Sequence, residues 1–204
     1  MKISIISGSH RLSGQSGKIA RVIAQSFSES SLCDESYLLD LADNPLPLWD
    51  DSIWSGDDSW QQRLAPISEQ LSSSDALVII VPEWHGMVPS GLKNFFLMWG
   101  KGELAHKPAL LVSVSSDDGG AYPIAELRMS SYKNNRICYL PEHLIIRKVE
   151  SVFNSSADDN DAKAQAYFEG RLDYCLKQLL TYAQAFKQIR ESDTTSLSTY
   201  RNGM

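Results

Sequence analysis

The chain has 204 residues, of which 43% are hydrophobic and 22% charged, so its composition is that of an ordinary globular protein. Its 25 acidic and 19 basic residues give a formal net charge of −6, which attracts neither a nucleic acid backbone nor an anionic membrane. Apolar runs such as residues 76–82 are far shorter than the roughly 20 residues of a membrane-spanning helix. We therefore expect no nucleic acid or membrane partner.

The three cysteines, Cys33, Cys138 and Cys175, are scattered and form no Cys-x-x-Cys pair. An odd set of isolated cysteines is typical of reduced thiols rather than of a disulfide framework or a zinc site. Ser4 and Ser7 interrupt the apolar stretch at the N-terminus, and no small-residue cleavage site follows, so no signal peptide is predicted. These features predict a cytoplasmic protein.

In chain order, runs of β-branched and apolar residues alternate with segments in which apolar residues recur at helical spacing. Strands are predicted at 2–7, 36–41, 76–81, 109–114 and 137–140, the last able to continue at 143–146. Helices are predicted around 19–27, 60–71 and 92–99, in a segment ending near 127, and from 162 to 189. A long irregular loop is predicted over 44–58, and Pro66 is expected to kink or interrupt the second helix.

This alternation predicts an α/β protein with a doubly wound, five-stranded parallel sheet and helices on both faces. We expect a single domain over residues 1–190 and a mobile polar tail over 191–204. In such sheets, ligands bind beyond the carboxyl ends of the strands, where the strand order reverses. The loops after the first, third and fourth strands are therefore the candidate binding segments.

The first of these loops, residues 7–16, joins a strand to the start of a helix. Backbone N–H groups at a helix start carry partial positive charge, and Arg11 can bind a phosphate through paired hydrogen bonds. Ser9, Ser13 and Ser16 add hydroxyls. The loop matches neither the Walker A nor the Gly-x-Gly-x-x-Gly pattern. Because serine- and glycine-rich turns often only cap helices, phosphate binding and capping stay about equally favoured.

The other two loops could contact a flat ligand. The loop after the third strand contains Pro82, Glu83, Trp84, His85 and Gly86, and an aromatic ring beside polar groups suits a heterocycle. Taken alone, however, that loop favours a structural alternative, in which the carboxylate caps a helix and the tryptophan lies at the surface. The loop after the fourth strand contains polar side chains and two glycines that permit close backbone approach, namely Ser115, Ser116, Gly119 and Gly120.

Catalytic arrangements of side chains are missing from the sequence. There is no Gly-x-Ser-x-Gly motif, and the four histidines do not have metal-ligand spacing. Binding loops without catalytic side chains are typical of an enzyme whose cofactor carries out the chemistry.

Three motifs match a known family in the correct order. Residues 8–11 match its Gly-Ser-x-Arg loop, and residues 82–94 match its Pro-Glu-Tyr-Asn-x-x-x-Pro-x-x-Leu-Lys-Asn segment. Residues 119–120, followed by 127–128, match its Gly-Gly loop and helical Leu-Arg. Over about residues 1–150 the chain thus resembles the NADPH-dependent FMN reductases, a flavodoxin-like group that includes quinone, azo-dye and chromate reductases.

The resemblance implies a non-covalently bound FMN. By position, its phosphate would be bound by Ser9, Arg11, Ser13 and Ser16. Its ring would be approached by Pro82, Glu83, Trp84, His85, Gly86, Ser115, Ser116, Gly119 and Gly120. The sequence departs from the family at Gly14, where a hydroxyl is common, at Trp84-His85, which replace Tyr-Asn, and at Ser116, where glycine is frequent.

The implied activity is that of an FMN-dependent NAD(P)H oxidoreductase. NADPH or NADH would give a hydride to the flavin and leave, and a small-molecule electron acceptor such as a quinone would replace it on the same ring face. Such a sequence of events is a ping-pong mechanism. Two alternatives are a flavodoxin-type electron carrier, which Arg11 and the chain length disfavour, and a non-enzymatic regulatory protein on the same fold, which Gly14 and Trp84-His85 keep open.

Self-association is predicted from the helix near residues 90–99. Its apolar side chains extend beyond the single stripe that a surface helix needs: Leu92, Phe95, Phe96, Leu97, Met98 and Trp99. Exposed apolar patches usually mark interfaces, and members of the resembling family are commonly dimers or tetramers. We expect a homodimer or homotetramer. The alternative is that the loop around Trp49 and Trp54, or the C-terminal helix, covers these side chains within one chain.

Overall fold

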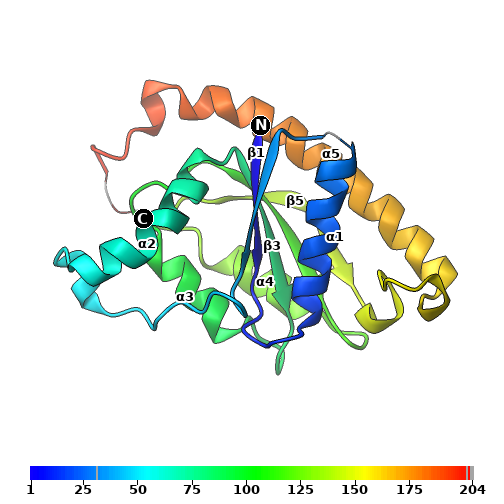
Figure 1. The fold of residues 1–204 in the computed structure, drawn as a ribbon. Helices are drawn as coiled ribbons and strands as arrows, with labels where there is room; N and C mark the ends of the chain where they lie inside the picture. The colour runs from blue at the N-terminus through cyan, green and yellow to red at the C-terminus, as the bar shows by residue number, and fades with distance from the viewer. Residues whose placement is uncertain (31, 201, 203–204) are drawn as a thin grey trace.

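The computed structural model describes residues 1–30, 32–200 and 202, and a parallel sheet forms the centre of this part of the chain (Figure 1). Its strands are β1 (Lys2–Ser7), β2 (Glu35–Asp40), β3 (Ala76–Pro82), β4 (Pro108–Val114) and β5 (Cys138–Ile146). They lie in the order β2-β1-β3-β4-β5, and every neighbouring pair is parallel. The predicted fold class is therefore confirmed.

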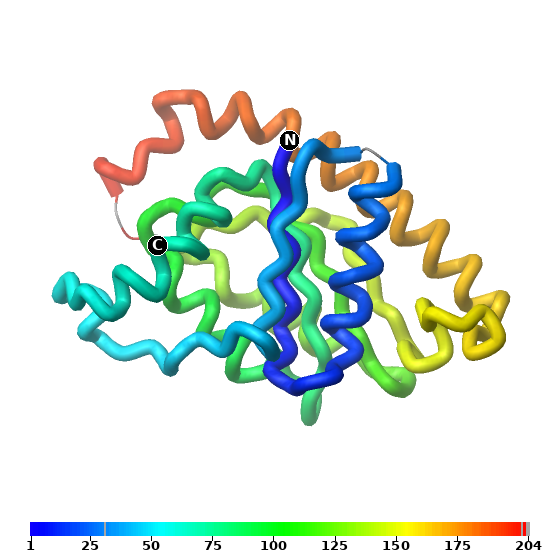
Figure 2. Tube along the Cα trace, in the orientation of Figure 1, coloured from blue at the N-terminus to red at the C-terminus, as the bar shows by residue number. Residues whose placement is uncertain are grey.

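Helices cover both faces of the sheet. They are α1 (Gln15–Ser30), α2 (Asp58–Ser73), α3 (Ser90–Met98), α4 (Ala121–Met129) and α5 (Ala162–Arg190). The helices α1 and α5 lie on one face, and α2, α3 and α4 lie on the other (Figure 1). Figure 2 shows α5 running obliquely across its face toward the edge where the N-terminus lies. No helix among the described residues is long and apolar enough to cross a membrane.

Two hydrophobic cores result from the alternation of side chains along the strands. Every residue of β3 and β4 is buried, as expected for strands covered on both faces. In β3, Val78 and Ile80 pack toward α1 and α5, whereas Leu77 and Ile79 pack toward the helices of the other face. The continuous apolar run at 76–81 therefore reflects burial on both sides of one strand.

Two local expectations are refined by the structure. The two segments predicted near the end of the sheet form one strand, β5, with a register shift opposite Ala109 and Leu111. The expected interruption at Pro66 is wrong, because α2 continues through it, and the alternative of a kink stays a prediction. Burial of Trp60, Leu64 and Leu71 on either side of Pro66 offsets the lost hydrogen bond and the crowding that a proline brings into a helix.

The apolar surface expected on α3 is mostly covered within the chain. Of the side chains singled out there, Leu97 is 61% exposed, and the others are buried. Trp49, from the long loop, packs against this core and donates its backbone N–H to Asn94 Oδ1 at 2.8 Å. The expectation of a wide uncovered helix surface is therefore wrong, because the loop covers it. Self-association itself stays a prediction.

The segment after α5 makes contacts with the rest of the chain. It contains a short 3-10 turn at Asp193–Thr195, Leu197 lies against Gly102, and Arg136 donates a hydrogen bond to the Tyr200 carbonyl. Residues 201 and 203–204 of the predicted tail lie outside the described residues. The mobility of the tail remains a prediction.

Candidate functional site

The loops after β1, β3 and β4 meet at the carboxyl edge of the sheet, around a cleft of about 100 Å³. The neighbours β1 and β3 mark the place where the strand order reverses. The cleft is lined by the predicted site residues Ser9, Arg11, Ser16, Pro82, Glu83, Trp84, Ser115 and Ser116. Its lining does not include Ser13, His85, Gly86, Gly119 and Gly120, and it adds Gly14, Gln15, Val114 and Val149.

Gly14 is required by the tight loop that precedes α1. Its N–H donates to the Arg11 carbonyl at 3.1 Å, and Ser13 has a positive φ of 58°. A Cβ at position 14 would lie 2.8 Å from Ser9 Oγ and 3.0 Å from the Arg11 carbonyl oxygen. A hydroxyl-bearing residue therefore does not fit this turn without a shift, which explains the departure from the family pattern.

Buried polar atoms at this edge lack hydrogen-bond partners among the described residues. They are Ser16 Oγ, Gln15 Oε1 and Ser7 Oγ. An unsatisfied buried polar group costs about 1–3 kcal/mol, so most such groups in folded proteins are partnered. A ligand that hydrogen-bonds to Ser16, which is only 1% exposed, would recover part of that cost.

The cation of the first loop is not neutralised within the described part of the chain. Arg11 is exposed, and no carboxylate there forms an ion pair with it. The first turn of α1 contains no acidic residue of its own, although Asp40 Oδ2 from β2 would lie 2.6 Å from a Cβ on Gly17. The charge of Arg11 therefore suits a phosphate bound before α1.

Glu83 joins two of the binding loops. Its Oε2 accepts the N–H of Gly120, which precedes α4 and has a φ of 98°. A Cβ on Gly119 would lie 2.9 Å from Glu83 Oε1, and Arg147 Nε donates to the carbonyls of Asp118 and Gly119. Glu83 thus caps α4, the structural alternative raised for this residue, and the Gly120 N–H is already used.

The third loop makes a two-residue turn. Trp84 and Met87 form an antiparallel bridge, and the residues between them, His85 and Gly86, have positive φ angles of 51° and 71°. Such turns favour Asn-Gly, and histidine is among the residues that tolerate positive φ. His85 and Gly86 therefore fit the positive φ angles that this turn requires.

Two aromatic side chains from the first and third loops are in contact. The rings of His10 and Trp84 meet edge to face, with centroids 4.7 Å apart and planes at 82°. A Cβ on Gly91 would come within 2.8 Å of His10 Nδ1, so the glycine leaves room for the imidazole. Trp84 is therefore held from the side by the loop after β1.

The hydroxyls of the fourth loop are partly used within the chain. Ser115 Oγ accepts the Asp117 N–H at 3.3 Å, and Ser116 Oγ donates to Glu150 at 3.4 Å. Each oxygen can still accept a further hydrogen bond, so both residues remain available to a ligand.

The loop after β5 completes the cleft through Val149, which sequence reasoning missed because it carries no polar motif. Lys18 of α1 holds this loop by donating to the carbonyls of Val149 and Val152 at 2.7 and 2.8 Å. Burial lowers the pKa of Lys18. The ammonium is therefore structural, and Arg11 is the cation left for an anion in the first loop.

Volume alone does not identify the site. A hollow of about 660 Å³ lies between α3 and α4, and one of about 850 Å³ lies beside α1. The cleft of about 100 Å³ is too small for a whole drug-sized ligand and can enclose only a phosphate-sized part. We place the candidate site at the cleft because the charge of Arg11 and the buried hydroxyl of Ser16 have no partner among the described residues. No cluster of three metal-binding side chains occurs in the described ranges.

The doubly wound parallel sheet and the anion-receptive loop at its switch point define a flavodoxin-like α/β protein. Residues 1–150 match the NADPH-dependent FMN reductase family, and the chain belongs to that family. The motifs in the first, third and fourth loops thus identified the family correctly.

Curated relatives agree with this assignment. The chain is 29% identical over 122 residues to an NADPH azoreductase of Bacillus sp. strain OY1-2, covering 59% of this chain and 62% of that enzyme. It is 27% identical over 130 residues to an FMN-dependent NADPH-azoreductase of Staphylococcus aureus strain USA300, covering 63% of this chain and 68% of that enzyme. The match therefore spans about two thirds of each relative.

Solved structures support the fold. The flavoenzyme NAD(P)H:(acceptor) oxidoreductase FerB of Paracoccus denitrificans matches with a TM-score of 0.68 and 21% identity, over 89% of this chain and 98% of that one. An NADH:FMN oxidoreductase, EMOB, matches with a TM-score of 0.65 and 16% identity, over 87% and 89%. At these identities the likeness concerns the fold alone.

Proposed function

We propose that this chain is an FMN-dependent NAD(P)H oxidoreductase that passes electrons to a quinone-like or other small acceptor. One observation carries the proposal: in a member of the FMN reductase family, the loop before α1 combines the unpaired cation Arg11 with the buried, unpartnered hydroxyl of Ser16. The names of the azoreductase relatives, which specify NADPH and FMN, support the choice of cofactor and co-substrate.

The residues of the first loop would hold the cofactor by its phosphate. Arg11 supplies the charge, the Ser9 and Ser16 hydroxyls supply hydrogen bonds, and the start of α1 supplies backbone donors. Ser13, an exposed residue of the same loop that lies outside the cleft lining, would add a further hydroxyl donor.

The other loops would orient the flavin ring. FMN, when bound, provides a ring that accepts a hydride from the nicotinamide and delivers reducing equivalents to the acceptor. Pro82 and Trp84 form one wall of the cleft, and Ser115 and Ser116 form another. The ring would lie against the turn of His85 and Gly86 and against the backbone of Gly119 and Gly120. Glu83 and Arg147 keep that backbone in place.

The visible absorption spectrum of the purified, FMN-loaded protein tests this proposal. We expect flavin peaks that bleach on addition of NADPH or NADH under anaerobic conditions and return on addition of a quinone. A protein that binds no flavin would support the regulatory alternative, and a bound flavin that neither nucleotide bleaches would support the electron carrier.

Steady-state kinetics test the shared ring face. If nicotinamide and acceptor occupy it in turn, double-reciprocal plots at several quinone concentrations are parallel lines. Intersecting lines, together with evidence for a ternary complex, would overturn the shared face while leaving FMN binding intact.

The proposal includes self-association in the cytoplasm. Apolar side chains remain exposed near α3 and α4: Leu48, Trp54, Leu97 and Met129. Their burial would favour a homodimer or homotetramer. Light scattering at micromolar concentration is expected to give at least twice the chain mass of 22.7 kDa, and a monomer would contradict this. Cys33, Cys138 and Cys175 are free thiols, which suits a reducing compartment.

A further inference from the structure

A second hollow lies beside the candidate cleft. It measures about 280 Å³ and is lined by His10, Leu41, Pro45, Leu46, Leu48, Ser90, Gly91 and Asn94. His10 lines this hollow, Trp84 lines the cleft, and their rings are in contact. One pair of aromatic rings therefore separates the two spaces. We call the second hollow the apolar slot.

The walls of the apolar slot are held in place. Asn94, which is 6% exposed, accepts the Trp49 N–H and donates to the Pro47 carbonyl, both at 2.8 Å. These two bonds fasten the loop after β2 to α3 and use both ends of the amide. Leu41 is buried at one wall, so the slot exists before any ligand binds.

The lining of the slot favours an apolar occupant. Leu41, Pro45, Leu46 and Leu48 line it together with Gly91, and the amide of Asn94 is already used. His10 and Ser90 are its remaining polar side chains. A volume of about 280 Å³ lies just below the range of about 300–1,000 Å³ for drug-sized ligands. It suits a short alkyl chain or one aromatic ring.

We propose that the apolar slot binds the non-reacting apolar substituent of the electron acceptor. This inference rests on the proposed function, because the reacting ring of the acceptor must lie at the flavin beside Trp84. His10, as the shared wall, is a positioning residue for the substituent. The preferred acceptors are then quinones with an alkyl or aryl substituent, since each buried methylene strengthens binding about three- to fourfold.

The test compares dimethoxy-methyl-benzoquinone with and without a hexyl chain. Their equilibrium affinities for the FMN-loaded protein are measured by calorimetry in the absence of nicotinamide, and kcat/KM is measured in its presence. We expect the wild type to favour the hexyl compound at least tenfold in both measurements. Equal values for the two quinones would overturn the proposal.

Variants locate the preference in the slot. Leu46→Ser is expected to reduce the hexyl preference about three- to tenfold, with the flavin spectrum and the kcat/KM for the shorter quinone unchanged. Leu46 also packs against the core, so Leu48→Ser, at a position 81% exposed, provides a second variant that leaves the core intact. The matched control is Ile189→Ser on α5, at a 41% exposed position outside both the slot and the apolar surface proposed for self-association, and it is expected to keep the full preference. An undiminished preference in Leu48→Ser and Leu46→Ser would overturn the proposal.

Different results would overturn the proposed function and the proposal for the slot. If the protein binds no flavin, the proposed function fails, and calorimetric titration with hexylbenzene then probes the slot directly. Binding that Leu48→Ser weakens would support the slot, and absence of binding would overturn it. If the flavin bleaches normally but the hexyl chain brings no gain, only the slot is overturned.

Discussion

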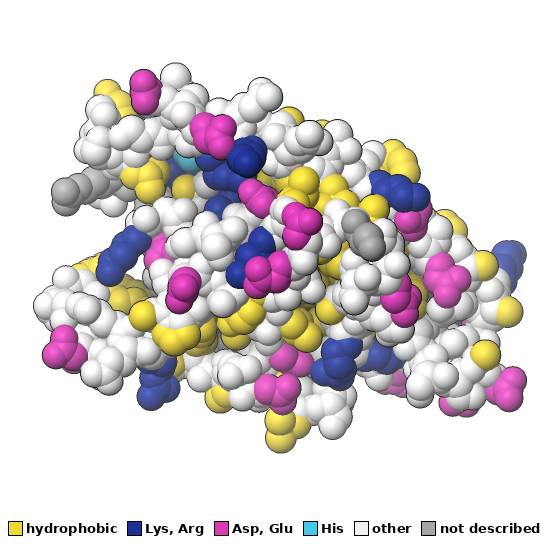
Figure 3. All heavy atoms as spheres, turned by 45° about the horizontal axis from the view of Figure 1, so that its top comes forward, with side chains coloured by type: hydrophobic (Ala, Val, Ile, Leu, Met, Phe, Trp, Pro, Cys, Tyr) yellow, Lys and Arg dark blue, Asp and Glu magenta, His cyan; other side chains and the backbone are white. Residues whose placement is uncertain are grey.

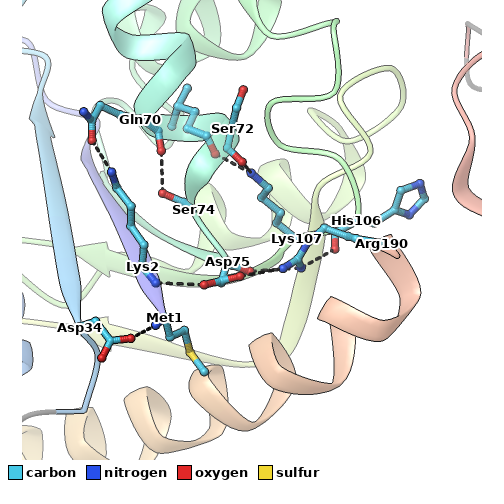
Figure 4. Close-up of polar contacts among 11 residues, drawn as sticks. Met1, Lys2, Asp34, Gln70, Ser72, Ser74, Asp75, His106, Lys107 and Arg190 are labelled. Atoms are coloured by element: carbon cyan, nitrogen blue, oxygen red, sulfur yellow. Dashed lines mark hydrogen bonds and ion pairs between the residues drawn. The ribbon is translucent and has the colours of Figure 1, made fainter. Parts of the chain in front are cut away.

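The two ends of the central sheet use their buried polar groups in opposite ways. At the amino edge, buried charged and polar side chains find partners within the chain (Figure 4). At the carboxyl edge, Ser7, Gln15 and Ser16 have buried atoms without partners among the described residues, and Arg11 has no acid to pair with there. Among these residues, those at the amino edge are paired within the chain, and those at the carboxyl edge keep hydrogen-bonding capacity for a ligand.

The amino edge is organised by Lys107, which is 4% exposed. Its Nζ donates to the carbonyls of Leu71 and Ser72, where α2 ends, at 2.5 and 2.8 Å. Arg190, near the end of α5, pairs with Asp75 at 3.0 Å (Figure 4). The contacts of Lys107 give hydrogen-bond donors to backbone carbonyls at the C-terminal end of α2. On the surface seen from this side, acidic and basic side chains are interspersed (Figure 3). This edge is therefore structural.

The two edges differ in the property that separates a structural polar cluster from a binding site. A perturbed pKa is by itself compatible with either role, because burial lowers the pKa of Lys107 to about 8 although the side chain is fully engaged. The distinguishing property is whether donors, acceptors and charge remain for a ligand. By that measure the carboxyl edge is the candidate binding site.

The largest effect is expected at the amino edge, on stability. The pKa of Lys107 is about 8 in the folded chain against 10.5 for an ordinary lysine, so the unfolded chain binds more protons between these values. The free energy of unfolding should therefore rise with pH across this window by up to about 3 kcal/mol, relative to Lys107→Met. Denaturant titrations of both proteins near either end of the window measure this difference. Parallel pH profiles would contradict it, and FMN affinity should not change.

The next effect is expected at the carboxyl edge, on binding. Arg11→Ala removes a charge-assisted hydrogen bond worth about 1.5–3 kcal/mol, so FMN affinity should fall about ten- to a hundredfold. The matched control is Arg63→Ala, because Arg63 is also an exposed arginine but lies on α2. It should leave FMN affinity unchanged. Equilibrium titration followed by flavin fluorescence measures both. An unchanged affinity in Arg11→Ala would mean that the phosphate lies elsewhere.

The smallest effects are expected from alanine variants of two buried serines, Ser4 at the amino edge and Ser16 at the carboxyl edge. Ser4 Oγ lies 2.6 Å from Ser74 Oγ, whereas Ser16 Oγ has no partner in the described chain. Ser4→Ala should lower the free energy of unfolding by about 1 kcal/mol without affecting FMN. Ser16→Ala should weaken FMN about two- to tenfold without loss of stability. If both variants shifted the same property, the two edges would not differ as described.

Local patterns predicted much of the fold. The β-branched run at 2–7 forms β1 with the predicted bounds, and the apolar run at 76–81 forms β3 with one further residue. Alternation of strands and helices was sufficient to place the candidate loops at one edge, because parallel strands end on the same side. These features depend on neighbouring residues, which a sequence displays directly.

Contacts between distant residues were harder to predict. The partner of Glu83 is Gly120, 37 positions away, and the cover of α3 comes from a loop 45 positions before Asn94. The need for glycine at position 14 depends on how Ser9 folds back over it. Such arrangements follow from the packed loops. Sequence reasoning therefore named candidate site residues but could not predict which of them, such as Glu83, are engaged within the chain.

The most direct test of the central claim compares FMN with riboflavin, which lacks the phosphate. Titration of the flavin-free protein with each ligand gives the contribution of the phosphate to affinity. If the carboxyl edge binds an anion with Arg11 and Ser16, FMN should bind at least tenfold more tightly than riboflavin, and Arg11→Ala should remove most of that preference. Equal affinity of the wild type for the two flavins would contradict the claim.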